Sequence, residues 1–127
     1  MTTKFDAIGL VATDLAASLD FYRALGLDVP AADGPHVEVT LPGGTRLMWD
    51  TVDTIHSFDP DWTPPTGGPR AALCFACEDV ADVDRTYQKL TAGGYHGHVA
   101  PFDAPWGYRY ATVHDPDGNG VDLFAPL

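Results

Sequence analysis

The sequence predicts an α+β domain built from two tandem modules of the βαβββ type. The chain has 127 residues, which suits one domain, 1–127, with a real hydrophobic core. Apolar extended segments alternate with segments of helical periodicity, and the whole pattern occurs twice. We therefore expect one module at about residues 1–65 and a second at about residues 66–127.

The internal repeat is the observation on which this prediction depends most. A shift of 65 residues places Asp14 on Asp79 and Tyr22 on Tyr87, and the apolar segment before each aspartate also coincides. Each half then reads as a strand, a helix and about three strands. Neither half carries enough apolar residues to be stable alone, so the halves are expected to share a sheet or to pack against a partner.

The first module begins with an apolar extended run at Phe5–Ala12, which predicts a buried strand. Asp14 can cap a helix, and Gly26 stands where a C-terminal cap is expected. Alternating segments at His36–Leu41 and Thr45–Asp50 predict two strands around a Pro-Gly-Gly turn.

A segment rich in Pro, Gly and Asp follows at Asp53–Pro69, and this composition predicts a linker. Phe58 and Trp62 lie within it. These two aromatic side chains either cover a cavity or hold the linker against the domain.

The second module repeats the order of the first. Arg70–Cys77 predicts a strand, Asp79 can cap a helix, and a Gly-Gly pair after Ala92 ends that helix. Tyr95–Asp103 is expected to be irregular or extended. Residues Trp106–Phe124 predict a β-hairpin around a turn rich in Asp, Pro, Gly and Asn.

The charge and the cysteines limit the classes of partner. Seven Lys and Arg against 18 Asp and Glu give a net charge of −11, so nucleic acids and anionic membranes are poor partners. No apolar run is long enough for a membrane span, and none resembles a signal peptide. Cys74 and Cys77 lie in an apolar stretch and are expected to be buried or half-buried thiols, which favours a reducing, cytoplasmic location.

Two segments of the chain resemble a known superfamily. The opening IGLVATDLAASLDFYRALGL and the closing DPDGNGVDLFAPL are similar to the vicinal oxygen chelate superfamily. This superfamily includes glyoxalase I, extradiol dioxygenases, fosfomycin-modifying enzymes and bleomycin-resistance proteins. The resemblance implies a cupped mixed sheet around a cavity and a homodimer, often with a cavity built from both chains.

Enzymes of this superfamily hold a divalent metal with His, Gln or Glu. The matching positions in this chain are Ala7, Ala72, a residue near Leu47, and Asp122. Alanine and leucine cannot coordinate a metal, and one carboxylate does not hold one tightly. The five histidines look too dispersed to form another site, so we expect no metal and no other cofactor.

Within the superfamily, WDTVDTIHSFDPDWTPPTGG and PWGYRYATVHDPDGN resemble the mitomycin-resistance type of drug-binding protein. In that type a flat ring is held between a His and a Trp. The matching residues here are His36 and Trp106.

Several candidate ligand-binding residues follow from the resemblance and from their positions at strand ends or in loops. They are His36, Trp49, Asp50, Phe58, Trp62, Trp106, Tyr108, Arg109 and Asp122. Alternatives remain for some of them. Trp49 and Trp106 can instead belong to the core, His36 can be an exposed edge residue, and Arg109 can pair with Asp115 or Asp117.

The sequence contains no nucleophile motif and no phosphate-binding glycine loop. We therefore expect a protein that binds rather than transforms its ligand. The expected function is metal-free sequestration of a planar aromatic or quinone-type antibiotic, such as a mitomycin-, bleomycin- or anthraquinone-type compound. The alternatives are a metal-dependent glyoxalase- or dioxygenase-like enzyme and a metal-free enzyme of antibiotic biosynthesis.

Overall fold

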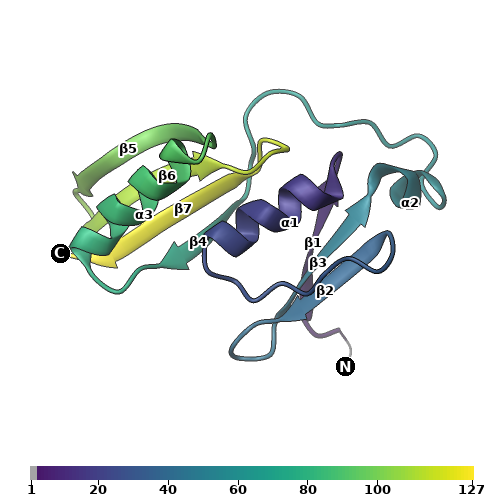
Figure 1. The fold of residues 1–127 in the computed structure, drawn as a ribbon, viewed down its shortest axis with the longest axis horizontal. Coiled ribbons are helices and arrows are strands. Elements are labelled where there is room, and N and C mark those ends of the chain that lie inside the picture. The colour runs from purple at the N-terminus through teal and green to yellow at the C-terminus, as the bar shows by residue number, and fades with distance from the viewer. Residues whose placement is uncertain (1–2) are drawn as a thin grey trace. The chain divides into compact units, whose positions relative to one another are not determined.

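The computed structural model describes residues 3–127 (Figure 1). The chain divides into two compact units, Met1–Pro64 and Pro65–Leu127. Each unit has its own sheet, three-stranded in the first and four-stranded in the second, so the expected single sheet is wrong for the described residues. Across residues 3–127, none of the helices combines the length and the apolar character that a membrane span requires.

The first unit consists of three strands and two helices. They are β1 (Ala7–Ala12), α1 (Leu15–Ala24), β2 (His36–Thr40), β3 (Arg46–Thr51) and α2 (Val52–His56). The strand order is β1-β3-β2, with β1 parallel and β2 antiparallel to β3.

The predicted ends of the first long helix are confirmed. The side chain of Asp14 accepts a hydrogen bond from the Ala17 amide at 3.1 Å, which satisfies one of the free N–H groups at the start of α1. Gly26 follows the helix with a φ of 107°, a conformation that favours glycine.

The core of the first unit lies between α1 and one face of its sheet. Leu47 and Trp49 of β3 are buried there, together with Leu19 and Tyr22 of α1. The Trp49 and Tyr22 rings meet edge to face with their centroids 5.5 Å apart. Trp49 is therefore a core residue, and its Nε1 finds no hydrogen-bond partner among residues 3–127.

The first unit departs from the predicted βαβββ order because only two strands follow α1. The chain after α1 is held by a side chain instead of by strand pairing. The Arg23 guanidinium donates hydrogen bonds to the carbonyl oxygens of Val29 at 3.1 Å and Pro30 at 2.8 Å. The predicted linker is also wrong at its start, since α2 begins at Val52 with Thr51 as its cap.

The second unit has the predicted strand, helix and three strands. They are β4 (Ala72–Ala76), α3 (Val80–Ala92), β5 (His96–Ala104), β6 (Tyr108–His114) and β7 (Gly120–Pro126). The strand order is β4-β7-β6-β5, and β4 runs parallel to β7 just as β1 runs parallel to β3.

The start of α3 and the β6–β7 turn follow the sequence prediction. Asp79 accepts a hydrogen bond from the Asp82 amide at 2.8 Å and so caps α3. The β6–β7 turn is organised by Asp115, which is buried and accepts hydrogen bonds from the amides of Asp117 and Asn119, both at 2.9 Å. Asp115 therefore serves the turn.

Helix α3 packs on one face of the four-stranded sheet. The sheet residues buried on that side alternate along β6 and β7, as expected for strands with one covered face. They are Ala111, Val113, Val121, Leu123 and Ala125.

Gly97 of β5 also faces α3. A Cβ placed there would clash with the Tyr87 hydroxyl and come within 2.8 Å of the Thr91 methyl group. Only glycine lets the helix approach this closely. His96 is paired with His114 and alternates with Gly97, so it points away from α3. His98 lies at the β-bulge after Gly97, and its ring stacks on His114 on the same side.

Candidate functional site

The face of the second sheet that α3 leaves uncovered is called here the open face. Strand alternation and the pairing register place a mixed set of aromatic and polar side chains on it. They are Cys74, His96, His98, Phe102, Tyr108, Tyr110, Thr112, His114, Asp122 and Phe124.

One end of the open face is aromatic. This aromatic end consists of Phe102, Trp106, Tyr108, Tyr110 and Phe124. The Trp106 ring meets Tyr110 edge to face at 5.4 Å and Phe102 at 6.1 Å. Trp106 nevertheless remains 56% exposed, so a large indole surface is available to a ligand.

A carboxylate lies in the middle of the open face. Asp122 accepts hydrogen bonds from the Tyr110 hydroxyl at 2.6 Å and the Thr112 hydroxyl at 2.8 Å, and the Cys74 thiol lies 3.9 Å away. Burial, followed by the hydrogen bond to the Asp122 carboxylate, raises the pKa of Tyr110. Tyr110 therefore stays protonated at neutral pH. Each of the two Asp122 carboxylate oxygens accepts a hydrogen bond from a hydroxyl group.

The metal positions of the resembled superfamily do not fit a metal here. Pairing of Gly9 with Met48 in the first unit corresponds to pairing of Cys74 with Asp122 in the second. The counterpart of Asp122, expected near Leu47, is thus Met48, and a thioether is a poor ligand for a hard divalent ion. Ala7 and Ala72 offer no ligand atom, so no chemical step is assigned to a metal at these positions.

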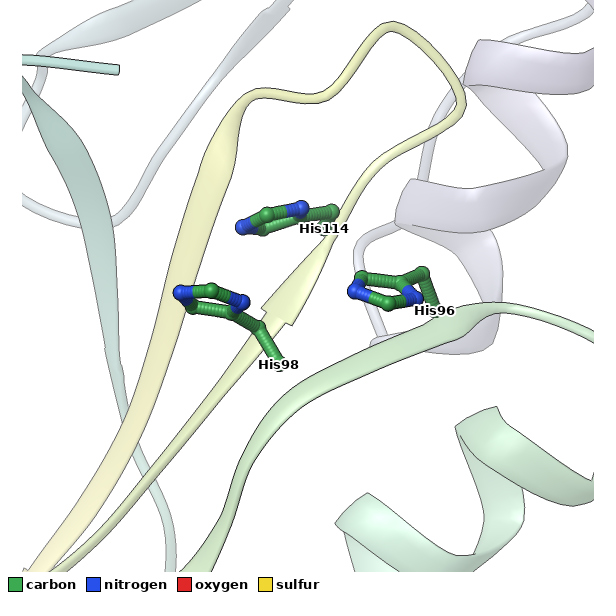
Figure 2. Close-up of side chains that lie close together, drawn as sticks. All are labelled: His96, His98 and His114. Carbon is green, nitrogen blue, oxygen red and sulfur yellow. The ribbon is translucent and has the colours of Figure 1, made fainter. Parts of the chain in front are cut away.

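The expectation that the histidines are dispersed is wrong for three of them. His96, His98 and His114 gather at the other end of the open face (Figure 2). One ring nitrogen from each lies within 4.8 Å of the others, and the His98 and His114 rings stack at 4.5 Å. Burial, and then the neighbouring His98 and His96 rings, lower the pKa of His114.

The sequence contains a local signal for this cluster. His-Gly-His places two imidazoles on one face of any strand, and the register pairs His96 with His114. Tyr95–Asp103 was expected to be irregular or extended, so no pairing register could be assigned to it.

A shallow hollow of about 310 Å³ lies beside the cluster. His98, His114, Thr112 and Asp122 line it together with Arg70 and neighbouring backbone. Its volume is at the lower limit for a ligand pocket, so it suits a small group or part of a larger molecule.

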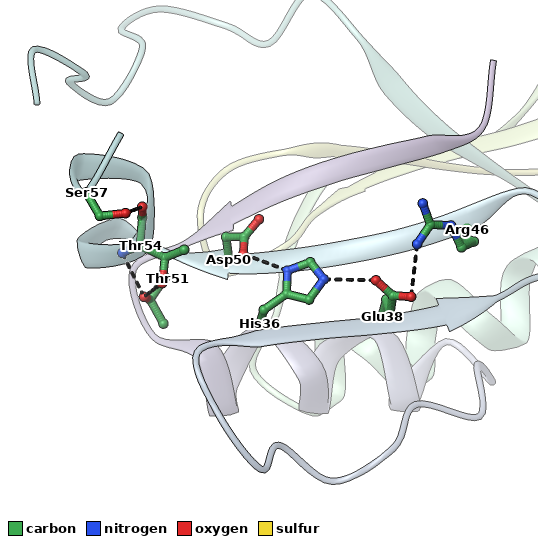
Figure 3. Close-up of polar contacts among 7 residues, drawn as sticks. All are labelled: His36, Glu38, Arg46, Asp50, Thr51, Thr54 and Ser57. Atoms are coloured by element: carbon green, nitrogen blue, oxygen red, sulfur yellow. Dashed lines mark hydrogen bonds and ion pairs between the residues drawn. The ribbon is translucent and has the colours of Figure 1, made fainter. Parts of the chain in front are cut away.

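The candidate residues of the first unit form a different kind of surface (Figure 3). His36 contacts Asp50 through Nδ1 at 2.7 Å and Glu38 through Nε2 at 2.9 Å, and Arg46 donates to Glu38 at 2.9 Å. The hydrogen bonds to Glu38 and then Asp50 raise the pKa of His36. Both ring nitrogens are thereby engaged within the unit.

Two further candidates of the first unit lie near α2. Phe58 is 72% exposed, and Trp62 is half-buried against His56, whose Nε2 lies 2.9 Å from the Trp62 carbonyl oxygen. Trp49, by contrast, is fully buried under α1 and cannot present its ring to a ligand on the sheet's other face. We therefore leave Trp49 out of the candidate site.

Arg109 is held by other carboxylates than predicted. Its guanidinium makes a bidentate pair with Asp84 of α3 at 3.0 and 3.1 Å and a further bond to Asp103 at 3.0 Å. These bonds draw it towards the helix side of the sheet, away from the open face. Its role in the structure is to tie α3 to the sheet, and Asp115 and Asp117 are not the partners seen.

The structure thus brings Trp106, Tyr108 and Asp122 to the open face of the second unit and pairs His36 with Asp50 in the first. The sequence did not identify Phe102, Tyr110 and Phe124 as members of the aromatic end. The predicted enclosure of a ring between His36 and Trp106 stays a prediction, because these residues belong to different units.

The cysteines are both free, but their environments differ. The prediction of a buried or half-buried thiol is wrong for Cys74, which is exposed on the open face. Cys77 is partly buried, and burial raises the pKa of its thiol.

Comparison with known proteins agrees with this architecture. An uncharacterized protein of Mycobacterium bovis is 30% identical over 125 residues, covering 93% of this chain and 80% of its own length. A glyoxalase/bleomycin resistance protein/dioxygenase family enzyme from Burkholderia phytofirmans superposes with a TM-score of 0.84 at 16% identity, covering 98% of this chain and 100% of its own. Protein ATC0852 of Agrobacterium tumefaciens gives a TM-score of 0.77 at 26% identity and covers 99% of both chains.

The family comparison covers almost the whole sequence. The family model of the Glyoxalase/Bleomycin resistance protein/Dioxygenase superfamily matches residues 4–123. This span includes the first sheet, the second sheet up to the middle of β7, and the three histidines of the open face. The chain therefore belongs to the glyoxalase/bleomycin resistance protein/dioxygenase superfamily.

Proposed function

We propose that this protein binds a planar aromatic antibiotic reversibly at the aromatic end of the open face and so keeps it from its target. The observation that carries the proposal is the exposed indole of Trp106, held edge to face by Phe102 and Tyr110. Soluble proteins rarely leave a large aromatic group exposed in an ordered cluster without a binding role. The resemblance to the mitomycin-resistance type points to a quinone-like ligand.

The affinity that a single aromatic surface can provide has an upper limit. Burying about 300 Å² of apolar surface contributes about 7.5 kcal/mol, and a favourable ring pair adds about 0.5–1.5 kcal/mol. Association costs at least about 4 kcal/mol, whereas micromolar affinity requires about 8.2 kcal/mol net. Contact with the aromatic end alone is therefore too weak for micromolar binding, and a second surface must cover the ligand.

We assign this second surface to another copy of the chain. Phe102 and Trp106 leave apolar surface exposed beside the aromatic end, and the superfamily resemblance implies cavities shared by two chains. Sedimentation velocity at micromolar concentration should give a homodimer. A strictly monomeric protein that still binds its ligand tightly would reject this assignment.

The rest of the surface agrees with a neutral or cationic ligand. The net charge of −11 disfavours anionic ligands, and Asp122 places a carboxylate next to the aromatic end. The binding uses no metal at the superfamily's usual positions, where Ala7 and Ala72 stand. Free Cys74 and Cys77 fit an action in the reducing cytoplasm.

Calorimetric titration with mitomycin-, bleomycin- and anthraquinone-type compounds tests the proposal. Trp106→Ala should weaken the best binder at least about tenfold, equivalent to about 1.4 kcal/mol. Phe5→Ala removes an even more exposed aromatic ring, 72% accessible, and should leave affinity unchanged. His36→Ala tests whether that residue also contacts the ligand, as the sequence predicts.

The proposal fails if none of these compounds binds, or if Trp106→Ala binds as tightly as the parent protein. Intrinsic fluorescence is a useful second readout because Trp106 is the most exposed of the three tryptophans. Quenching that persists in Trp106→Phe but disappears in Trp62→Phe would place the ligand elsewhere.

A metal-free enzyme of antibiotic biosynthesis is a second candidate, and the Tyr110–Asp122 pair favours it. A protonated phenol hydrogen-bonded to a carboxylate at 2.6 Å can exchange a proton with a bound ligand. Mass spectrometry of the ligand after prolonged incubation separates the two functions. Turnover that Tyr110→Phe abolishes, with affinity retained, would make the protein an enzyme.

A further inference from the structure

We propose that His96, His98 and His114 form a binding site for one divalent transition-metal ion, with Zn²⁺ as the expected occupant. The site lies on the open face of the second unit and uses none of the superfamily's metal positions. It does not depend on the proposed antibiotic binding, since it uses different side chains.

The backbone holds the three side chains together. His96 and His98 lie on β5 with Gly97 between them, and Gly97 faces α3, where a side chain would clash with Tyr87. His114 lies directly opposite His96 on β6. Two neighbouring strands therefore present three imidazoles to one side (Figure 2).

The distances are close to those of a metal site. One ring nitrogen of each histidine lies within 4.8 Å of the others. Tetrahedral coordination with Zn–N bonds of about 2.0–2.1 Å requires nitrogens about 3.3 Å apart. Small rotations of the side chains cover the difference, and the exposed rings of His96 and His98 have room to make them.

The ring nitrogens are available to an ion. Within residues 3–127, no hydrogen bond or ion pair engages any of the three imidazoles, whereas both nitrogens of His36 are engaged. Three nitrogen donors select Zn²⁺, Cu²⁺, Ni²⁺ or Co²⁺ over Mg²⁺ and Ca²⁺. Three protein ligands leave a coordination position open to water or to an oxygen or nitrogen atom of a small molecule.

The surroundings set the expected strength of binding. The net charge of −11 attracts a cation, but Arg70 lines the adjoining hollow and opposes one. Most metal-bound histidines donate their other ring N–H to a carboxylate or carbonyl, which strengthens metal binding. Among the described residues, no such hydrogen bond is made by His96, His98 or His114. We therefore expect binding that is specific but weaker than that of a buried structural zinc site.

The open coordination position would face the same surface as the aromatic end. Tyr110 and His114 lie four residues apart on β6, which corresponds to about 14 Å along the strand. A ligand that stacks at the aromatic end and carries a donor atom at its far edge could reach the ion.

Titration of tag-free, ¹⁵N-labelled protein with ZnCl₂ tests the site directly. Long-range ¹H–¹⁵N spectra report each imidazole nitrogen, and those of His96, His98 and His114 should shift together and saturate at one equivalent. Signals of His36 and His56 should stay in place. Co²⁺ in place of Zn²⁺ should give the visible absorption of a tetrahedral nitrogen site.

Variants assign the ligands. His96→Ala, His98→Ala and His114→Ala should each weaken Zn²⁺ binding at least about tenfold, since loss of an outer partner alone costs that much. His56→Ala is the matched control, because His56 is exposed in the first unit and bonded to the Trp62 carbonyl. Its affinity should equal that of the parent protein.

The inference is overturned if Zn²⁺ moves none of the three histidine signals at one equivalent, or if His56→Ala lowers affinity as much as His98→Ala. His96 and His98 are exposed, so their variants should fold as the parent does even if His114→Ala does not. Circular dichroism of each variant establishes this before titration.

Discussion

The two units share one pattern of strand pairing but differ in what their uncovered sheet faces carry. In the first unit His36, Glu38, Arg46 and Asp50 form a network in which both nitrogens of the histidine are engaged (Figure 3). In the second, the corresponding face carries exposed aromatic rings and three imidazoles without hydrogen bonds among the described residues. In the first unit the polar side chains of the uncovered face are therefore hydrogen-bonded to one another, whereas in the second unit the side chains of that face remain available to a ligand.

Substitution of Trp49 and of Trp106 should show the largest difference in stability between the two units. Trp49→Ala should lower the free energy of unfolding by about 3–5 kcal/mol, because it leaves a cavity under α1. Trp106→Ala should change it by less than about 1 kcal/mol, because the indole is largely exposed. Urea unfolding measures both, and equal losses would contradict the assignment of Trp49 to the core and Trp106 to a binding surface.

The glycines Gly97 and Gly9 give the next largest effect. Gly97→Ala should cost about 1–3 kcal/mol, since the new methyl group must displace Tyr87 and Thr91 of α3. Gly9→Ala is the matched change on β1, where no atom lies within 4 Å of the new Cβ, and it should be nearly neutral. If Gly97→Ala is equally neutral in thermal unfolding, β5 does not pack on α3 as described, and the orientation of His96 and His98 must be revised.

Tyr110→Phe should have a smaller effect. It removes a partly buried hydrogen bond to the Asp122 carboxylate, for which the expected loss of stability is about 1.5 kcal/mol. Tyr108→Phe is the control, since the Tyr108 hydroxyl has no hydrogen-bond partner among residues 3–127. Urea midpoints that are the same for both variants would show that the Tyr110–Asp122 bond contributes nothing.

The network of the first unit predicts the smallest effect, a dependence of stability on pH. The pKa of His36 is raised by Glu38 and Asp50, so its contribution is complete below the unfolded value of about 6.5 and is lost as pH rises through the folded pKa. The pKa of Glu38 is lowered by His36 and Arg46, so its contribution is lost as pH falls below about 4.5 and through its folded pKa. The network should therefore stabilise most between about pH 4.5 and 6.5.

His36→Gln isolates this effect. The difference in thermal midpoint between the parent and His36→Gln should shrink as pH rises from 6 to 8. His114 has the opposite dependence because its pKa is lowered, and subtraction removes its contribution. A difference that grows over this range would mean that His36 is not held in its charged form.

Local signals in the sequence were enough to predict where the main helix of each unit begins. Asp14 and Asp79 each precede a helical segment, and each accepts the expected capping hydrogen bond. The absence of a third strand after α1 was not predictable in this way. In the segment after α1, the carbonyls of Val29 and Pro30 accept hydrogen bonds from Arg23, a contact that only the folded chain creates.

The site was only partly predictable, for a related reason. Trp106 and Asp122 stand out in the sequence, but a face of a sheet is defined by the register between strands. His114 meets His96 only when β5 and β6 pair in the observed register, and Arg109 turns to Asp84 only because α3 lies on that side. Contacts between residues distant in sequence therefore account for what sequence patterns missed.

The most direct test of the account maps the ligand onto the two units. Backbone and indole ¹H–¹⁵N signals should be followed while an anthraquinone-type compound is added to the labelled protein. The indole of Trp106 and the amides of β6 should shift in proportion to occupancy, and the buried indole of Trp49 should not. Saturable shifts that spare Trp106 and β6 would contradict the claim that the open face of the second unit is the binding surface.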